Sequence, residues 1–400
     1  MFLVHCDFTM GSISQAITEM GVDLYNELNK NAANKNIFIS PMSISTGLVM
    51  VLLGARGNTA TQMQTVSVNK TLVHAFIFYK LFFVKANIKR IHTEFQTLLS
   101  QLKKLNKSYV LSLANSLFAQ KGYNFHQQYL ECTKELYGAM LQTVDFENAT
   151  EAARQKINSW VESKTQGKIR ELFVSGVIDP TAVLVLVNAI YFKATWEYTF
   201  EEKYTMPKDF RINQNESKSV QMMYQKDRFK IAHIQEMNAQ ILMIPYAGKS
   251  LSMIILLPDD ITGLEQIERA MTYEKLICWT SLESMRDREV EVYLPRFKLE
   301  DTFELNLPLQ EMGMIDVFEE SKADLSGMAP SRKLFLSKVV HKAYVEVNEE
   351  GTLAAAATGS VVVNRSHLSG GLFMADHPFL FFIQHNPTNT ILFLGKLCSP

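Results

Sequence analysis

The chain has 400 residues and a net charge of −1 at pH 7; 47% of the residues are hydrophobic and 20% are charged. This composition is typical of a soluble globular protein with a large core. The near-zero charge argues against nucleic acid or an anionic membrane as the main partner. No Pro/Gly/Ser-rich linker, low-complexity tract or repeat divides the sequence, so we expect a single domain over residues 1–400.

Cysteine usage and the N-terminus bear on the compartment. The cysteines at positions 6, 132, 278 and 398 form no CxxC pair and are too few for a disulfide framework. We expect neither a metal nor a cofactor, and a reduced, intracellular protein is the natural interpretation. Residues 1–9 precede Met10 and lack the basic start, long apolar core and cleavage site of a signal peptide, so they form a candidate extra leader.

Helical patterns dominate the N-terminal quarter of the chain. Apolar spacing predicts a helix over residues 14–28, and Ser43 is the predicted N-cap of an apolar helix that ends near Gly54. Residues 66–88 are atypical because they contain the strongly apolar run TLVHAFIFYKLFFVKAN. This run is too short to span a membrane and is broken by Lys80. An interfacial patch, a buried segment and a gene-prediction error are the alternatives. A further amphipathic helix begins at His92.

Strand patterns prevail further along the chain. Alternation predicts a strand over residues 108–119, and Thr150 is the predicted N-cap of a helix. Residues 182–192 form an apolar run with one polar residue, Asn188, as expected for a strand buried on both faces. Further strands are predicted over residues 221–258 and 290–299.

Catalytic motifs do not occur in the sequence. We find no nucleophile elbow, HExxH pattern, phosphate-binding loop or dinucleotide glycine pattern, and the histidines do not fall at metal-ligand spacing. We therefore expect an inhibitor or a binding protein rather than an enzyme.

One stretch near the C-terminus, residues 349–368, differs from an ordinary loop. It is rich in Ala and Val and carries no charge between Thr352 and Asn364. Its first half has high helix propensity, whereas its second half favours a strand. As a strand it would present small residues on one face: Thr352, Ala354, Ala356, Thr358 and Ser360. The composition predicts a segment that switches between exposed loop and buried strand, with a flexible linker as the alternative.

The flanks of this stretch carry a family resemblance. VNEEGTLAAAATG and ADHPFLFFIQHNPTNTILFLGKLCSP resemble the hinge and the C-terminal strands of the serpin family, and the ending Leu397–Pro400 resembles its ovalbumin-like branch, clade B. The resemblance covers nearly all of the chain and is weakest over residues 66–88. It implies an α+β fold of three β-sheets with about nine helices and an exposed reactive-centre loop at residues 349–368.

The resemblance also implies roles for individual residues. The hinge of the loop comprises Glu349, Gly351, Thr352, Ala354, Ala355, Ala356 and Ala357. The shutter and breach, beneath and at the top of the main sheet, comprise Ser40, Ser43, Asn188, Trp196, Arg296 and His341. By the family pattern Asn188 pairs with His341, and Arg296 pairs with Glu349; an exposed ion pair would contribute under ~1 kcal/mol. Ala194 replaces the usual Gly of the FKGxW pattern, so this turn must not need positive φ.

The implied mechanism is that of a suicide substrate. The length of the family hinge places the scissile bond at Arg365–Ser366, and Arg before the bond suits trypsin-like serine proteases, whose specificity pocket holds an acid. The protease would form an acyl-enzyme at Arg365, and the cleaved loop from Thr352 onward would insert into the main sheet.

A non-inhibitory, ovalbumin-like protein for storage, chaperoning or binding is the alternative. The hinge departs from the family at Leu353, where Glu is usual, but alternation turns that side chain outward, where it does not block insertion. We expect a monomer without a transmembrane span, and Lys103 and Lys104 make polyanion binding a minor option. Without a cleavable signal we expect a cytoplasmic protein, an extracellular one exported by another route, or both.

Overall fold

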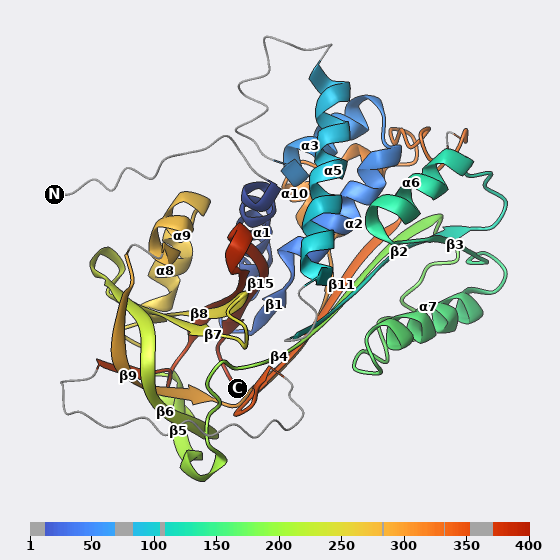
Figure 1. The fold of residues 1–400 in the computed structure, drawn as a ribbon. Coiled ribbons are helices and arrows are strands. Elements are labelled where there is room, and N and C mark those ends of the chain that lie inside the picture. The colour runs from blue at the N-terminus through green and yellow to red at the C-terminus, as the bar shows by residue number, and fades with distance from the viewer. Residues whose placement is uncertain (1–12, 69–82, 105–108, 282–283, 332, 353–370) are drawn as a thin grey trace.

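The computed structural model describes residues 13–68, 83–104, 109–281, 284–331, 333–352 and 371–400. Figure 1 draws the remaining residues as a grey trace. Helices and strands are mixed along the described chain, and most strand pairs are antiparallel, which confirms the α+β class.

The described part of the chain forms nine α-helices. They are α1 (Ile13–Asn29), α2 (Pro41–Gly54), α3 (Gly57–Val68), α5 (Phe83–Lys104), α6 (Gln127–Tyr137), α7 (Thr150–Lys164), α8 (Leu264–Ala270), α9 (Tyr273–Thr280) and α10 (Asn306–Glu311). The helix predicted at residues 14–28 is confirmed as α1, and the one predicted from His92 lies within α5. Residues 69–82 lie outside the described residues, so the alternatives for the atypical stretch stay open.

Two predicted helix caps are wrong. Ser40, not Ser43, caps α2: its hydroxyl accepts a hydrogen bond of 3.2 Å from the amide of Ser43. Pro41 causes this shift, because its fixed φ and missing N–H suit the first position of a helix. Thr150 is the first residue of α7 rather than its cap, since its hydroxyl donates back to the carbonyl of Phe146.

Six strands form the main sheet. Their order is β10 (Phe297–Glu304), β11 (Lys338–Asn348), β12 (Gly351–Thr352), β4 (Leu184–Thr195), β2 (Tyr109–Gln120) and β3 (Leu141–Val144). Strands β11 and β4 also pair with each other directly and in parallel, with Lys338–Tyr344 beside Val185–Tyr191. We call this direct pairing the seam. Beyond it the two strands continue on either side of β12.

The remaining strands form a second sheet. Its order is β1 (Ile37–Ile39), β15 (Thr390–Leu397), β14 (Phe379–His385), β8 (Leu251–Pro258), β7 (Ala239–Pro245), β6 (Glu216–Ile234), β9 (Arg286–Pro295) and β13 (Gly371–Met374), with β5 (Met206–Asn213) also on β6. The long strand β6 pairs with β9 over most of its length and with β7 over its last residues. This shared strand joins what would otherwise be two smaller sheets, so the three expected sheets form two continuous hydrogen-bonded ones.

The strand predicted at residues 290–299 is two strands. It divides at Pro295 and Arg296 into β9, in the second sheet, and β10, in the main sheet. Proline has no N–H to donate to a ladder, which favours a break at this position. The chain therefore crosses from one sheet to the other at Arg296.

Apolar side chains fill both faces of the main sheet. Along β4, Leu184, Leu186, Ile190 and Phe192 join the larger cluster, whereas Val185, Val187, Ala189 and Tyr191 join the smaller one. Figure 1 shows α2, α5 and α6 on the first side of the sheet and α7 on the other. The predicted burial of residues 182–192 on two faces is therefore confirmed.

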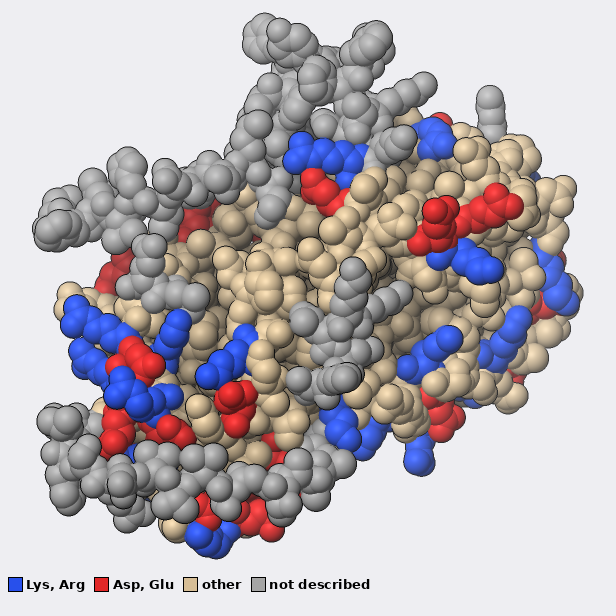
Figure 2. All heavy atoms as spheres, viewed as in Figure 1, with Lys and Arg blue, Asp and Glu red and all other residues tan. Residues whose placement is uncertain are grey.

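The surface shows mixed charge. On the face drawn in Figure 2, acidic and basic side chains of the described residues are interspersed. Among the helices that the structure describes, none is long and apolar enough to cross a membrane.

Candidate functional site

The predicted site residues divide into two groups. Arg365, Ser366 and the hinge alanines Ala354, Ala355, Ala356 and Ala357 lie outside the described residues. The first part of the hinge is described, together with the shutter and breach residues. These described residues lie around β12, beyond one end of the seam, and at the middle of the seam.

Strand β12 already lies between β11 and β4. Thr352 is antiparallel to Val347 on one side and to Ala194 on the other, and it is completely buried. This corrects the expectation that Thr352 enters the sheet only after cleavage. The direct pairing of β11 with β4 stops at Tyr344 and Tyr191. Beyond these residues the two strands are separated, and β12 lies in the gap between them.

Glycine is required at position 351. Its φ of 148° lies in the region that favours glycine, and a Cβ there would clash with the carbonyl oxygen of Ala194. The hinge backbone can lie this close to β4 because Gly351 has no side chain. Ala194 itself lies within β4 and is not among the residues with positive φ, so its replacement of the family glycine is tolerated, as predicted.

Two stacked aromatic rings support the end of the hinge. Trp196 and Tyr246 stack with centroids 4.6 Å apart, and the Tyr246 hydroxyl lies 2.8 Å from Oγ1 of Thr352. Burial raises the pKa of Tyr246, so its hydroxyl stays protonated and available for this contact. The side chain of Thr352 therefore points into the interior, where a larger or charged residue would not fit.

The turn between β11 and β12 is tied to its surroundings through the backbone. The Asn348 side-chain oxygen accepts from the amides of Glu350 and Gly351, both at 3.2 Å. Trp196 donates through its indole N–H to Asn348 and through its amide to Glu350, at 3.0 and 2.9 Å. These bonds fix the direction in which the chain leaves the turn.

The Glu349 carboxylate is buried and held by two side chains. Arg296 donates from Nε to both carboxylate oxygens at 2.6 Å, and Thr205 donates from its hydroxyl. The predicted pairing is thus present, but the assumption of an exposed pair is wrong for its acidic member: the Glu349 side chain is 4% exposed and that of Arg296 is 40% exposed. A buried carboxylate depends on its cation far more than an exposed one does.

A buried polar network crosses the seam at its middle. The His341 Nδ1 and the Asn188 Oδ1 are in hydrogen-bond contact, and Asn188 donates to the Ser43 carbonyl at 2.6 Å. Asn188 also donates to Asn115, which in turn donates to the Ser43 carbonyl at 3.2 Å. Ser40 contributes its amide, which donates to His341 at 3.1 Å. The structure therefore brings the four predicted shutter residues together.

The tautomer of His341 follows from these bonds. Nε2 accepts from a backbone amide, so Nδ1 carries the proton and donates to the Asn188 oxygen. Burial lowers the pKa of His341 to about 3, because the charged imidazolium would lose its hydration. The network is thus built for a neutral histidine.

Sequence reasoning missed four contributors to the site. These are Asn115, Thr205, Tyr246 and Asn348. Asn115 had a usable signal, since it interrupts the apolar inward face of a predicted strand. The other three contact the hinge from turns and strand ends, where no sequence period indicates direction.

The arrangement can accept a strand. Both strands that flank β12 continue beyond it, and no group of His, Cys, Asp and Glu in the described residues could hold a metal ion. The chemistry available here is main-chain pairing: β12, extended along the gap, would replace the direct pairing of β11 with β4.

Comparisons with known proteins agree with this geometry. A family model described as "Serpin (serine protease inhibitor)" matches residues 15–400. Leukocyte elastase inhibitor from Sus scrofa and Serpin B10 from Homo sapiens are 49% and 48% identical, each over 98% of this chain and 100% of their own. Uncleaved ovalbumin (TM-score 0.85, 40% identity) and a loop-inserted, cleaved ovalbumin mutant (TM-score 0.84, 39% identity) each cover 98% of this chain and 100% of theirs.

Replacing Arg296 by Met should destabilise the protein by about 2–3 kcal/mol, because it leaves the buried Glu349 carboxylate without its cation. Urea unfolding measures the change. Arg228→Met removes an exposed pair with Asp287 and should cost under ~1 kcal/mol. Equal costs for the two variants would contradict the account of the hinge acid.

His341→Gln should change the acid dependence of stability. In the unfolded chain the imidazole has a pKa near 6.5, against about 3 in the folded protein. As pH falls from 6.5 toward 3 the unfolded wild type gains a proton that the folded one does not, so its free energy of unfolding drops by up to ~1.4 kcal/mol per pH unit. The variant lacks this loss.

We therefore expect His341→Gln to be about 1–3 kcal/mol less stable than wild type at pH 7.5, with a gap that narrows below pH 6.5. Asn115→Ala is the control, because it removes an uncharged member of the same network and its gap should not depend on pH. Urea unfolding of wild type and both variants between pH 7.5 and 5 measures these differences in the free energy of unfolding. A constant gap for His341→Gln would refute the buried neutral histidine.

Proposed function

Because the chain belongs to the serpin family, on its ovalbumin-like branch, we propose that it inhibits trypsin-like serine proteases as a suicide substrate. The protease would cleave Arg365–Ser366 and be trapped as an acyl-enzyme while the freed loop inserts into the main sheet. As a serpin the chain is not an enzyme. The observation that carries the proposal is β12, which already pairs with both β11 and β4.

The register of β12 supports insertion of the residues that follow it. Continued by six residues along both neighbours, that register would bring Thr358 opposite His341 and Asn188. A threonine hydroxyl there could replace hydrogen bonds that parting the two strands breaks. The polar network at the middle of the seam would thus be satisfied before and after insertion.

The composition of the loop fits the two faces that it would meet. Thr352 points inward, so alternation sends Ala354, Ala356 and Ser360 to the same densely packed face, where small side chains are needed. In the same register Leu353 would lie on the opposite face between Glu346 and Lys193, both of which are only half-buried. The departure from the family hinge at Leu353 therefore gives no steric reason against insertion.

Specificity rests on Arg365. A guanidinium before the scissile bond fits a protease pocket with a buried carboxylate, because each charge satisfies the other. Leukocyte elastase inhibitor, by its name, acts on an elastase. We propose a different target class for this chain on the basis of its arginine. Since Thr352 already lies in the sheet, the twelve residues from Leu353 to Asn364 would span ~41 Å at ~3.4 Å each on insertion and carry the bound protease that far.

A non-inhibitory role is the second candidate. The similarity to uncleaved ovalbumin over 98% of this chain is compatible with this role, because likeness of fold alone does not establish an inhibitory activity. The two candidates differ in what a protease does to the loop. An inhibitor traps the protease, whereas a non-inhibitory relative is merely cut.

The direct experiment is to mix the protein with trypsin and look for a covalent complex. We expect an SDS-stable band at the summed mass of the two proteins, with cleavage mapped to Arg365–Ser366 by mass spectrometry. Arg365→Ala should remove the band with trypsin. Cleavage at Arg365 in the wild type without any complex would support the non-inhibitory alternative.

Thr352→Arg should convert the inhibitor into a substrate. The new side chain would point at Tyr246 in a fully buried position, and burying an unpaired charge is costly. Trypsin should still cut Arg365, but the SDS-stable complex should vanish. Thr352→Ser keeps the hydroxyl and should retain the complex. An unchanged yield of the SDS-stable complex in Thr352→Arg would contradict the insertion mechanism.

A further inference from the structure

A cleft opens on the outer side of the main sheet. It lies between the segment of residues 165–183, which joins α7 to β4, and strands β10 and β11. Its volume is about 500 Å³, which falls in the range of binding sites for small molecules. The cleft is therefore large enough for a small organic ligand, and its lining decides what kind.

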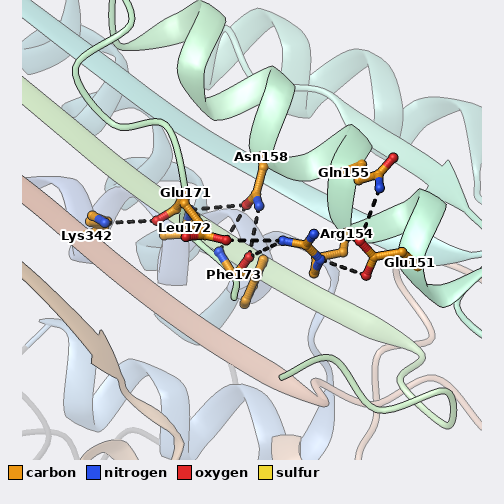
Figure 3. Close-up of polar contacts among 8 residues, drawn as sticks. All are labelled: Glu151, Arg154, Gln155, Asn158, Glu171, Leu172, Phe173 and Lys342. Atoms are coloured by element: carbon orange, nitrogen blue, oxygen red, sulfur yellow. Dashed lines mark hydrogen bonds and ion pairs between the residues drawn. The ribbon is translucent and has the colours of Figure 1, made fainter. Parts of the chain in front are cut away.

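Polar contacts hold both walls of the cleft. Figure 3 shows Arg154 of α7 and Lys342 of β11 reaching the segment from opposite sides. Arg154 donates to the Phe173 carbonyl at 2.6 Å, and Lys342 donates to the Glu171 carbonyl at 2.9 Å. The cleft is thus formed before any ligand arrives, as is usual for small-molecule sites.

The floor of the cleft exposes apolar surface. Val174 and Val177 are 53% and 39% exposed, whereas Leu172 beside them is buried in the cluster under the segment. Apolar surface in a concave site is released from water when an apolar group covers it, which favours binding. The floor therefore suits a ligand with an apolar body.

Both acids that line the cleft already have cationic partners. Glu300 pairs with Lys342 at 3.0 Å and with Lys298 at 3.5 Å. The Glu171 carboxylate lies 3.5 Å from Arg154, which belongs to α7 and not to the cleft. Neither acid is left to neutralise the other positive charges of the lining.

Two cations remain at the rim. Lys168 is half-buried, and no acid pairs with it among the residues that the structure describes; its ammonium lies 5.8 Å from the centre of the Tyr344 ring. Arg170 is largely exposed and lies 3.8 Å from Glu162. Since a charged donor binds an anionic oxygen more strongly than a neutral one, the rim suits a carboxylate or sulfonate.

We propose that this cleft binds a small amphipathic organic acid, with the acid group on Lys168 and the apolar chain over Val174 and Val177. Arg170 adds positive charge where the ligand enters. A neutral lipid would leave the Lys168 ammonium without a partner, and a compact inorganic anion would leave the valines in water. The cleft shares no residue with the hinge or the shutter, so the inference stands apart from the proposed protease inhibition.

Fluorescence titration of the full-length protein tests the proposal. The probe is dansylaminoundecanoate, a fluorescent fatty acid, and its methyl ester is the uncharged counterpart. We expect saturable binding of the acid, and binding of the ester weaker by at least about tenfold, because the ester cannot form a charge-assisted hydrogen bond with Lys168.

Substitutions in the cleft separate its two parts. Lys168→Met should weaken binding of the acid by at least about tenfold and leave that of the ester unchanged, whereas Lys168→Arg keeps a cation and should retain most of the affinity. Val174→Asp puts a carboxylate on the apolar floor and should abolish saturable binding of both compounds. Urea unfolding checks that each variant is folded.

Lys298→Met is the matched control. Lys298 pairs with Glu300 and lies 4.9 Å from the centre of the same Tyr344 ring, but it does not line the cleft. Its affinity for the acid should equal that of wild type. Absence of saturable binding to wild type would overturn the proposal. So would binding that survives either Lys168→Met or Val174→Asp unchanged, because the acid group or the chain would then lie elsewhere.

Discussion

The direct, parallel pairing of β11 with β4 is the contact on which the site depends. At one end the two strands diverge, and β12 fills the space between them with hydrogen bonds to both. Along the seam itself, the backbone groups of β11 and β4 bond directly to each other. The chain therefore has two ways of satisfying these groups, by pairing β11 with β4 or by placing a further strand between them. A sheet with two alternatives of similar pairing is a bistable element.

Three sets of side chains hold the closed arrangement, and each acts at a different level. At the top, Trp196, Tyr246 and Asn348 fix the turn from which β12 emerges. In the middle, the neutral His341 joins the two strands through Asn188. On the outer face, the segment of residues 165–183 is bonded to α7 through Arg154 and to β11 through Lys342. None of these contacts uses apolar burial alone, so each can be exchanged for another polar contact when the strands part.

Much of this arrangement could be predicted from the sequence. The apolar run with one asparagine identified β4 and its burial on both faces. The uncharged stretch after Glu350 predicted a segment able to enter a sheet, and Gly351 and Thr352 are the part of it that the structure describes there. Pairing of Asn188 with His341 and of Arg296 with Glu349 came only from family resemblance, because no local pattern links residues so far apart in the chain.

Other features required the three-dimensional structure. The division of residues 286–304 into strands of two sheets was missed, although the apolar positions shift from Val290, Val292 and Leu294 to Phe297 and Leu299 across Pro295 and Arg296. The burial of Glu349 results from Thr205 and Arg296 converging on it. The covering of the outer face by residues 165–183 was not predicted, because side chains of α7 and β11 hold it through backbone carbonyls, which leave no trace in sequence spacing.

The central claim is that the cleaved loop becomes a strand between β11 and β4, and thermal unfolding of the nicked protein tests it most directly. Protein cut only at Arg365–Ser366, as verified by mass spectrometry, is compared with uncut protein in the same buffer by calorimetry. A new central strand would add hydrogen bonds on both sides and bury the small side chains of the loop. The account predicts a midpoint higher by on the order of 10 °C or more. An unchanged or lower midpoint, as for a nick in a loop that stays outside the sheet, would contradict it.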